Sequence, residues 1–234
     1  MRWLRTLVLF STGEVISSND WQIVHESYVR SIQSIDHPEG SGTLTLRRRE
    51  KRPFGQWQRN GVGYLRRRFL EHIVGVEGWY LEEDVDLGDV APAPVTLYPL
   101  MEERFEPVTS EFGGFDFVTT APNGTRIAIE WETGNISSSH RSMNKLAIAL
   151  EGGIVGAAVL IVPSRAPYDH LTDRIGNIGE LSGYLRMWQS LGRSVERGLL
   201  AVTVVEQDHL TSDEQLPFLP TGNDGRAAEG RSKK

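Results

Sequence analysis

Two glutamates, Glu130 and Glu132, form the pattern in this sequence that is best suited to chemistry. They lie in residues 126–132, where apolar and polar side chains alternate as they do in a β-strand. The alternation places both carboxylates on one face, ~6.5–7 Å apart along the chain. The apolar side chains of the other face are Ile127, Ile129 and Trp131. We therefore expect a strand that packs on one face and presents two acids on the other.

A third acid, Asp116, lies in a strand expected over residues 115–120, which a turn at 121–124 joins to the strand of the glutamates. Three carboxylates at the end of one hairpin repel each other unless a positive charge lies between them. A hard divalent cation with oxygen ligands, Mg²⁺ first, suits such a set. The alternative is a group of exposed carboxylates on an edge strand.

The register of this hairpin decides whether the three acids can meet. If the loop is the four residues 121–124, Asp116 pairs with Ile129 and points away from Glu130. A loop of odd length, or one β-bulge, pairs Asp116 with Glu130 and brings all three acids to one face. The metal site therefore requires an odd loop or a bulge.

Charge is distributed unevenly along the chain, whose formal net charge is −6. Residues 47–68 contain nine basic residues and one acid, which gives this segment +8 and leaves −14 for the rest. Residues 77–116 contain eleven acids and one arginine. A polyanion responds to clusters within about a Debye length, ~8–10 Å. The two segments suggest a site for phosphates and divalent cations, although two solvated faces would give the same pattern.

Composition excludes several classes of protein. The longest apolar stretch, residues 154–162, is too short for a membrane span, which needs roughly 18 residues. We find no signal-peptide pattern at the beginning of the sequence. The absence of cysteine excludes disulfide frameworks, thiol nucleophiles and cysteine-based zinc sites. We expect a cytoplasmic globular protein without a membrane segment.

Hydrophobic periodicity predicts one α/β domain over residues 1–211. The expected strands are 4–10, 43–46, 115–120, 126–132, 154–162 and 198–205. The expected helices are 21–35, capped by Asn19 or Asp20, 62–74, 140–151, capped within 137–139, and 178–191. Residues 87–107, with four prolines, suggest an extended excursion. The order of elements predicts a mixed central β-sheet flanked by helices on both faces. Residues 212–234 lose all periodicity, and we expect them to form a disordered tail.

The motifs around the hairpin resemble a known family. Phe115-Asp116-Phe117, the hairpin, Ile129-Glu130-Trp131-Glu132, Gly134-Asn135 and a helix with Asn144-Lys145 look like the PD-(D/E)XK nuclease core. More narrowly, they are similar to the branch of type II restriction endonucleases typified by BamHI and BglII. The resemblance covers residues 112–163, with a fainter echo at 63–74. The residue before Asp116 is phenylalanine where the motif has proline.

This resemblance implies a restriction-endonuclease-like fold and a metal-dependent phosphodiesterase. The implied substrate is duplex DNA, cut at a short palindromic site by a homodimer. Carried over by position, Asp116 and Glu130 would bind Mg²⁺. Glu132 takes the motif position that a lysine usually occupies, where it could orient or deprotonate the attacking water. Two further glutamates, Glu71 and Glu111, are candidates for an auxiliary acid.

Candidate contacts to DNA come from two segments. Arg66 and Arg67 belong to the basic segment and face away from the apolar stripe of their expected helix. The helix after the hairpin offers His140, Arg141 and Lys145, the first two near its N-terminus, which favours phosphate. Ordinary surface positions are the alternative for all five.

Two other functions remain open from the residues alone. A glycoside hydrolase could use the Glu130/Glu132 pair, since retaining enzymes place their carboxyl groups ~5–5.5 Å apart. A DNA-binding or assembly module could retain the nuclease fold without turnover. The homodimer would use helix 140–151 or helix 178–191, whose apolar stripe contains Leu181, Leu185, Trp188 and Leu191.

Overall fold

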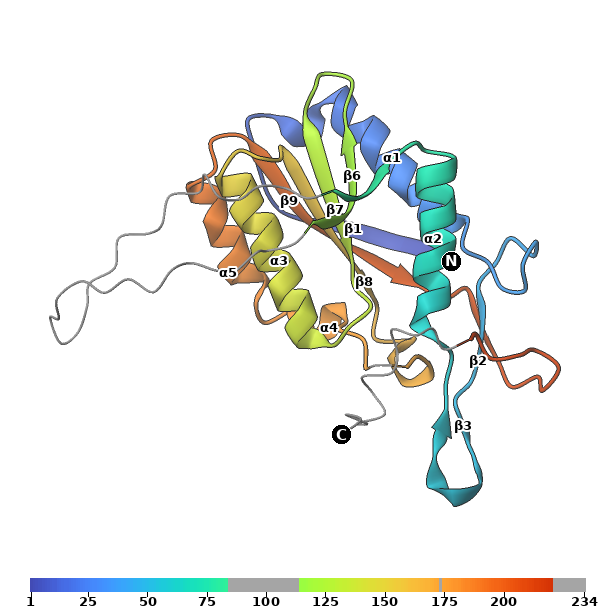
Figure 1. The fold of residues 1–234 in the computed structure, drawn as a ribbon. Coiled ribbons are helices and arrows are strands. Elements are labelled where there is room, and N and C mark those ends of the chain that lie inside the picture. Colours follow the sequence, from blue (N-terminus) through green and yellow to red (C-terminus); the bar gives the residue numbers. More distant parts are fainter. Residues whose placement is uncertain (84–113, 173, 221–234) are drawn as a thin grey trace, which may run out of the picture.

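A six-stranded mixed β-sheet forms the centre of the protein in a computed structural model that describes residues 1–83, 114–172 and 174–220 (Figure 1). In spatial order the strands are β1 (Arg2–Thr12), β9 (Gly198–Glu206), β8 (Ala157–Pro163), β7 (Arg126–Trp131), β6 (Phe115–Thr120) and β5 (Tyr80–Glu83). β7, β8 and β9 are parallel, and the other neighbours are antiparallel. The expected α/β class with a mixed sheet is confirmed.

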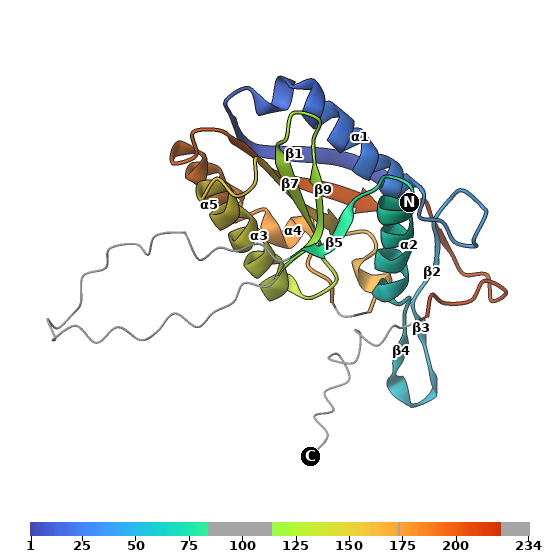
Figure 2. The ribbon, with the colours of Figure 1, turned by 45° about the horizontal axis from the view of Figure 1, so that its top comes forward.

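Helices cover both faces of the sheet, as Figures 1 and 2 show. One face packs against α1 (Asn19–Gln33) and α2 (Val62–Gly75), and the other against α3 (Ile136–Glu151), α4 (Ile178–Leu181) and α5 (Leu185–Ser190). Each layer has its own apolar cluster. Every residue of β8 is buried, as expected for a central parallel strand covered on both sides.

Smaller elements lie beside the main sheet. β2 (Thr45–Arg47) pairs in parallel with β10 (His209–Thr211). β3 (Glu50–Lys51) and β4 (Trp57–Gln58) form a hairpin that projects from the body of the molecule (Figure 1). Short 3₁₀ segments occupy Val15–Ser17, Pro53–Gly55, Tyr168–His170 and Leu191–Arg193.

The β6–β7 hairpin has the odd loop that the metal site requires. Thr120 pairs with Arg126, so five residues, 121–125, connect the strands. The register from Phe117–Ile129 onward places Asp116 opposite Glu130. The side chains of β7 alternate between the two faces of the sheet, as expected. Its isoleucines lie in the apolar cluster under α1 and α2, whereas Ala128 lies in the cluster under α3.

Two helices begin earlier than their periodicity indicated. α1 begins at Asn19, because the Ser18 side chain caps it by accepting from the Trp21 amide at 3.1 Å. α3 begins at Ile136 and not at residue 140, because Asn135 is the N-cap and accepts from the Ser137 amide at 2.9 Å. Asparagine and serine both cap well, so several candidates in a row leave the first turn ambiguous.

The helix expected over 178–191 is broken into α4 and α5 at residues 182–184. Leu181 and Trp188 are fully buried in the cluster under α3. The Trp188 indole also donates to Asn144 Oδ1 at 3.1 Å. Leu181 and Trp188 therefore belong to the core, whereas Leu191 is 36% exposed, so only part of the expected stripe lies at the surface for a dimer contact.

The packed chain extends beyond the expected boundary at residue 211. Leu219 is fully buried in the main core, and its carbonyl accepts from the Gly61 amide at 3.0 Å. Packed residues thus continue into the stretch 212–220, which the sequence placed in the tail because Leu216 and Leu219, with Pro217 between them, show no helical or strand period. The remainder of that tail, the excursion at 87–107 and Glu111 lie outside the described residues. The described helices include none with the length and apolarity needed to cross a membrane.

Candidate active site

The two glutamates lie at the carboxyl end of β7, beneath α3. Glu130 is the fifth residue of β7, and Glu132 follows its last residue. Their exposed fractions are only 6% and 4%. Carboxylates are rarely buried to this extent without a partner, because the charged form loses its hydration. The burial excludes the interpretation as exposed edge-strand acids.

Asp116 joins the glutamates from the neighbouring strand. Its Oδ2 accepts a hydrogen bond from the Trp131 amide at 2.9 Å, which ties the two strands together between the glutamates. Its Oδ1 accepts from Arg66 of α2 at 3.0 Å. Arg66, expected to contact DNA phosphate, is thus paired with an acid of the site.

Glu130 has an unusually high affinity for a proton. Burial raises its pKa to about 7, and the nearby negative charge of Asp116 contributes in the same direction. The charge of Lys145 and hydrogen bonds from Lys145 and Ser142 oppose the rise. The positive charge near Asp116 and Glu130 therefore does not compensate for the burial of Glu130. A bound cation would supply the missing charge and lower the pKa of Glu130.

Lys145 of α3 brings a second cation to the site, beside Arg66. Its Nζ lies 2.5 Å from Glu130 Oε1 and donates to the Gly114 carbonyl at 2.8 Å. It also lies 4.9 Å from the centre of the Phe115 ring. Only 8% of the residue is exposed, so Lys145 is held in the protein beside the acids and is not the ordinary surface lysine of the alternative interpretation.

Glu132 is held by the turn that follows β7. Its Oε1 accepts from the Gly134 amide at 2.6 Å, and the nearby Ser139 hydroxyl also favours its charged form. Burial outweighs both and raises the pKa of Glu132. Any residue larger than glycine at position 134 would require Ser138 to shift, because a Cβ there would collide with the Ser138 hydroxyl and lie 3.2 Å from Glu132 Oε1.

The acids suit a hard divalent cation with an incomplete protein ligand set. In the described ranges, no group of three acidic or histidine side chains is close enough to hold a metal by itself. The same ranges supply no hydrogen bond to the buried Glu132 Oε2. Mg²⁺ is commonly held by one or two carboxylates, with water and phosphate oxygens completing its shell. Asp116 and Glu130 meet that requirement, so the donor set fits.

The other candidates have partners of their own, and of these only Arg141 is shown to act on one of the three acids. Glu71, the candidate auxiliary acid, forms ion pairs on α2: it lies 3.9 Å from the exposed Arg67 and accepts a hydrogen bond from Arg68. The His140 ring packs against the rings of Tyr184 and Trp188. Arg141 is exposed, and its charge lowers the pKa of Glu132.

The sequence did contain a signal for Lys145 and Ser142. Both lie on the face of α3 that begins with Ser139, because residues three apart are neighbours on a helix. The Ser142 hydroxyl is 3.4 Å from Glu130 Oε2. A lysine within the apolar turns of a helix that packs on the glutamate strand could have been assigned to the glutamates by that spacing.

Comparison with known proteins places this site in a family. The sequence model described as "Restriction endonuclease BamHI" matches residues 1–226. This chain belongs to the BamHI restriction endonuclease family. The resemblance drawn from the hairpin motifs is confirmed, and with it membership of the type II site-specific deoxyribonucleases.

Two members of the family align over most of the chain. The type II restriction enzyme OkrAI of Oceanobacter kriegii is 31% identical over 198 residues, which cover 84% of this chain and 85% of that enzyme. The type II restriction enzyme BamHI of Bacillus amyloliquefaciens is 26% identical over 211 residues, covering 87% and 82%.

A solved structure supports the fold. The restriction endonuclease BglII in complex with a DNA 16-mer matches with a TM-score of 0.52 at 9% identity. The match covers 88% of this chain and 79% of that one. At this identity it bears on the fold alone.

Proposed function

We propose that this protein is a Mg²⁺-dependent type II endonuclease that cleaves duplex DNA at a short palindromic site. The observation that carries the proposal is the group of three buried or half-buried acids at the carboxyl end of β7. Two of them have raised pKa values, and their partners come from α2, α3 and the turn after β7. Membership of the restriction endonuclease family supports DNA as the substrate.

Asp116 and Glu130 would hold the cation. When bound, Mg²⁺ would activate water and offset the charge that builds up on the scissile phosphate. The protein orients both ligands from separate elements. Arg66 and the Trp131 amide fix Asp116, and Lys145 fixes Glu130. These contacts keep the two carboxylates aimed before the substrate arrives, so little reorganisation is needed at the reaction step.

Glu132 is suited to accept a proton from the attacking water. Its Oε1 is occupied by the Gly134 amide, and no described residue donates a hydrogen bond to Oε2. A raised pKa makes its carboxylate a stronger base than an ordinary glutamate. We assign the general-base role to this residue and the positioning role to Gly134.

Glu132 occupies the motif position where a lysine would supply positive charge. Lys145 supplies that charge from α3 instead. Its ammonium group is anchored by the Gly114 carbonyl and by Glu130. Because it approaches from α3, it stabilises negative charge near Glu130 without occupying the strand position of the base. We propose Lys145 as a positioning residue that holds Glu130 in its charged form.

Cleavage of supercoiled plasmid DNA tests the proposed function. We expect a few discrete linear fragments with Mg²⁺ and unchanged plasmid after the metal is removed with EDTA, because water activation is lost. Restoring Mg²⁺ should restore the same fragments. Retained duplex binding without cleavage at any Mg²⁺ concentration would instead identify a non-catalytic module, and hydrolysis of oligosaccharides would identify a glycosidase.

The proposed palindromic site requires two active sites. A double-strand break needs hydrolysis on antiparallel strands, and a two-fold homodimer supplies both centres from one gene product. We therefore expect a dimer by sedimentation velocity at micromolar concentration with cognate duplex. A complex containing one protein chain would contradict the homodimer and indicate a nicking enzyme. A location in the cytoplasm, with the DNA, follows from the same proposal.

A further inference from the structure

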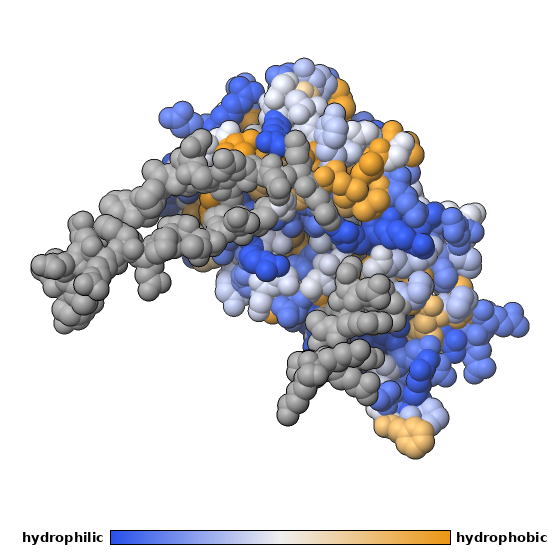
Figure 3. Space-filling model, viewed as in Figure 1, coloured by the Kyte–Doolittle hydropathy of each residue, from blue (hydrophilic) through white to orange (hydrophobic). Residues whose placement is uncertain are grey.

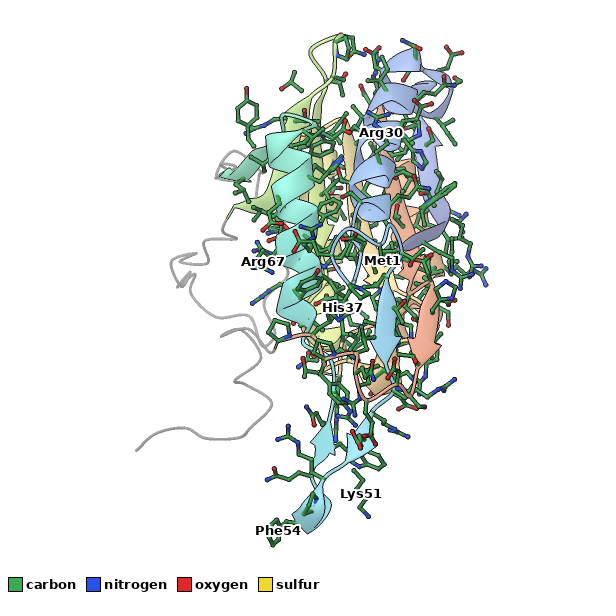
Figure 4. The ribbon with its side chains drawn as sticks, turned by 90° about the vertical axis from the view of Figure 1, so that its right-hand side faces the viewer. Met1, Arg30, His37, Lys51, Phe54 and Arg67 are labelled. Atoms are coloured by element: carbon green, nitrogen blue, oxygen red, sulfur yellow. The ribbon has the colours of Figure 1, made fainter. Side chains whose placement is uncertain are left out.

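The β3–β4 arm, residues 48–59, is a projecting hairpin of unusual composition. It carries five basic residues and one acid in a chain whose net charge is −6. Figure 4 shows Phe54 at its tip and Lys51 nearby, both pointing away from the body. Phe54 is fully exposed, and 48% of Trp57 is exposed. Figure 3 shows the apolar tip beside hydrophilic surface.

The tip holds its phenylalanine in a backbone conformation that disfavours it. The Gly55 amide donates to the Arg52 carbonyl at 3.1 Å across a turn with Pro53 at its second position. Phe54, at the third position, has φ 75° and ψ 15°. These angles match a type II turn, which normally has glycine at that position. A bulky side chain there neither stabilises the turn nor packs in the core, so its exposure calls for another explanation.

The base of the arm is fixed to the body. The buried Asn60 side chain donates to the carbonyls of Arg47 and His170 at 2.7 and 2.9 Å, and the Arg49 amide donates to His170 Nδ1 at 3.1 Å. The Arg49 guanidinium lies 4.7 Å from the Trp57 ring centre and also reaches Asp169. The arm is therefore a supported element with a defined direction.

The arm leaves the molecule at the edge that bears the candidate active site. Residue 170 follows β8, and β8 runs parallel to β7, so the carboxyl ends of both strands share one edge. Asn60 forms a β-bridge with Leu171 at that edge. Figure 1 shows the arm extending from the same end of the molecule as the beginning of α3. Six extended residues reach ~20 Å, about the width of a DNA duplex.

The basic side chains in and next to the arm differ in whether they form ion pairs with acids of the protein. Among the described residues, the Arg52 side chain hydrogen-bonds to the neutral Gln58, to whose Oε1 its Nε donates at 2.9 Å, and it forms no ion pair there. Lys51 is exposed, and the described ion pairs do not include it. By contrast, Arg47, directly before the arm, is paired with Glu50 at 2.8 Å. Lys51 and Arg52 thus present charge to the solvent at the tip, next to Phe54.

We propose that the β3–β4 arm binds duplex DNA outside the scissile phosphate, with Lys51 and Arg52 on phosphates and Phe54 in the major groove. A two-stranded ribbon fits that groove, and side chains at its rim reach the backbone. The exposed surface of Phe54 and of half of Trp57 is too small for a protein interface, whereas the charge excess complements a polyanion. The proposal rests on the proposed function, since it names how the same substrate is held.

Salt dependence of binding tests the cations. Binding of the full-length protein to a 30-base-pair duplex that spans the mapped cleavage site is measured by fluorescence anisotropy with EDTA present. For Lys51→Ala/Arg52→Ala we expect the slope of log Kd against log salt to fall by ~1.8, about 0.9 for each lost phosphate contact. The matched control is Arg193→Ala/Arg197→Ala, which removes two exposed cations just before β9, at the opposite edge of the parallel strands. We expect its slope to equal that of the wild type.

Phe54→Gly separates DNA contact from a structural role. Glycine suits the turn, so the melting temperature should stay level or rise, while affinity for the 30-base-pair duplex should fall about tenfold at every salt concentration. A 12-base-pair duplex centred on the same site removes the flanking DNA that the proposal assigns to the arm. On it, wild type and variant should bind equally.

Each outcome has a distinct meaning. If the wild-type protein neither cleaves plasmid nor binds duplex DNA, the proposed function fails. If it cleaves but all arm variants bind the long duplex as tightly and with the same slope, only the arm proposal is overturned. A Phe54→Gly protein that changes from dimer to monomer in sedimentation while its DNA affinity holds would overturn the proposal in favour of a contact between copies.

Discussion

Replacing any of the three acids by its amide, Asp116→Asn, Glu130→Gln or Glu132→Gln, is expected to lower DNA cleavage by at least about 10³-fold. That loss corresponds to ~4 kcal/mol of the activation barrier, the order that one ligand or base contributes in a metal-assisted hydrolysis. The amides keep the size of each side chain, remove its charge and replace one acceptor oxygen by an NH2 donor. Single-turnover cleavage of a labelled duplex measures the effect.

Measuring the free energy of unfolding should show that the loss of cleavage in these variants does not come from unfolding. Glu132 is buried without a cationic partner among the described residues, so Glu132→Gln should leave the free energy of unfolding unchanged or raise it. The exposed Glu151, on the last turn of α3, provides a control of equal charge change. Glu151→Gln should cleave within about twofold of the wild-type rate. Near-wild-type cleavage by Glu132→Gln would contradict the assignment of the base.

Removal of Lys145 is expected to cost both stability and activity. Lys145→Met leaves the charge of Glu130 buried without its ion pair, and breaking a buried pair from one side costs about 3–5 kcal/mol. Lys145→Met/Glu130→Gln removes both charges and should recover most of that loss. Both variants should fail to cleave DNA. Urea unfolding of the wild type, both single variants and the double variant gives the coupling energy directly.

The pH dependence of the Lys145→Met effect has a definite sign. The pKa of Glu130 in the folded wild type is raised to about 7, so its stability contribution is complete below the unfolded value near 4.5 and is lost as pH rises through 7. Without Lys145 the folded pKa rises further, and more stability is lost over the same rise in pH. The difference between variant and wild type should therefore shrink as pH falls toward 4.5. A difference that is independent of pH would show that lost packing, and not the ion pair, explains the effect.

The sequence predicted the parts of this fold that depend on local pattern. Alternation in residues 126–132 was enough to separate the faces of β7 and to place Glu130 and Glu132 together. The unbroken apolar run before Pro163 identified β8 as a strand buried on both sides. In each case the pattern reports directly which side chains leave water, and burial of those side chains dominates the energetics.

The missing parts depend on contacts between distant segments. The register of the hairpin turned on whether Thr125 belongs to the loop, a difference of one residue that no local pattern encodes. The break after Leu181 and the burial of Leu219 arise from tertiary packing. The pairing of Lys145 with Glu130 and of Arg66 with Asp116 joins segments 15 and 50 residues apart. Residue types and spacing could place Lys145 on the face of α3 toward the glutamates, but they could not pair Arg66 with Asp116.

Sequencing the ends of plasmid DNA cut by the wild-type protein tests the central claim most directly. Digestion with Mg²⁺ should yield ends that share one short sequence, with breaks on the two strands related by two-fold symmetry, and Glu130→Gln assayed in parallel should yield none. Ends scattered over unrelated sequences, or equal cleavage by Glu130→Gln, would contradict a site-specific endonuclease built on these acids.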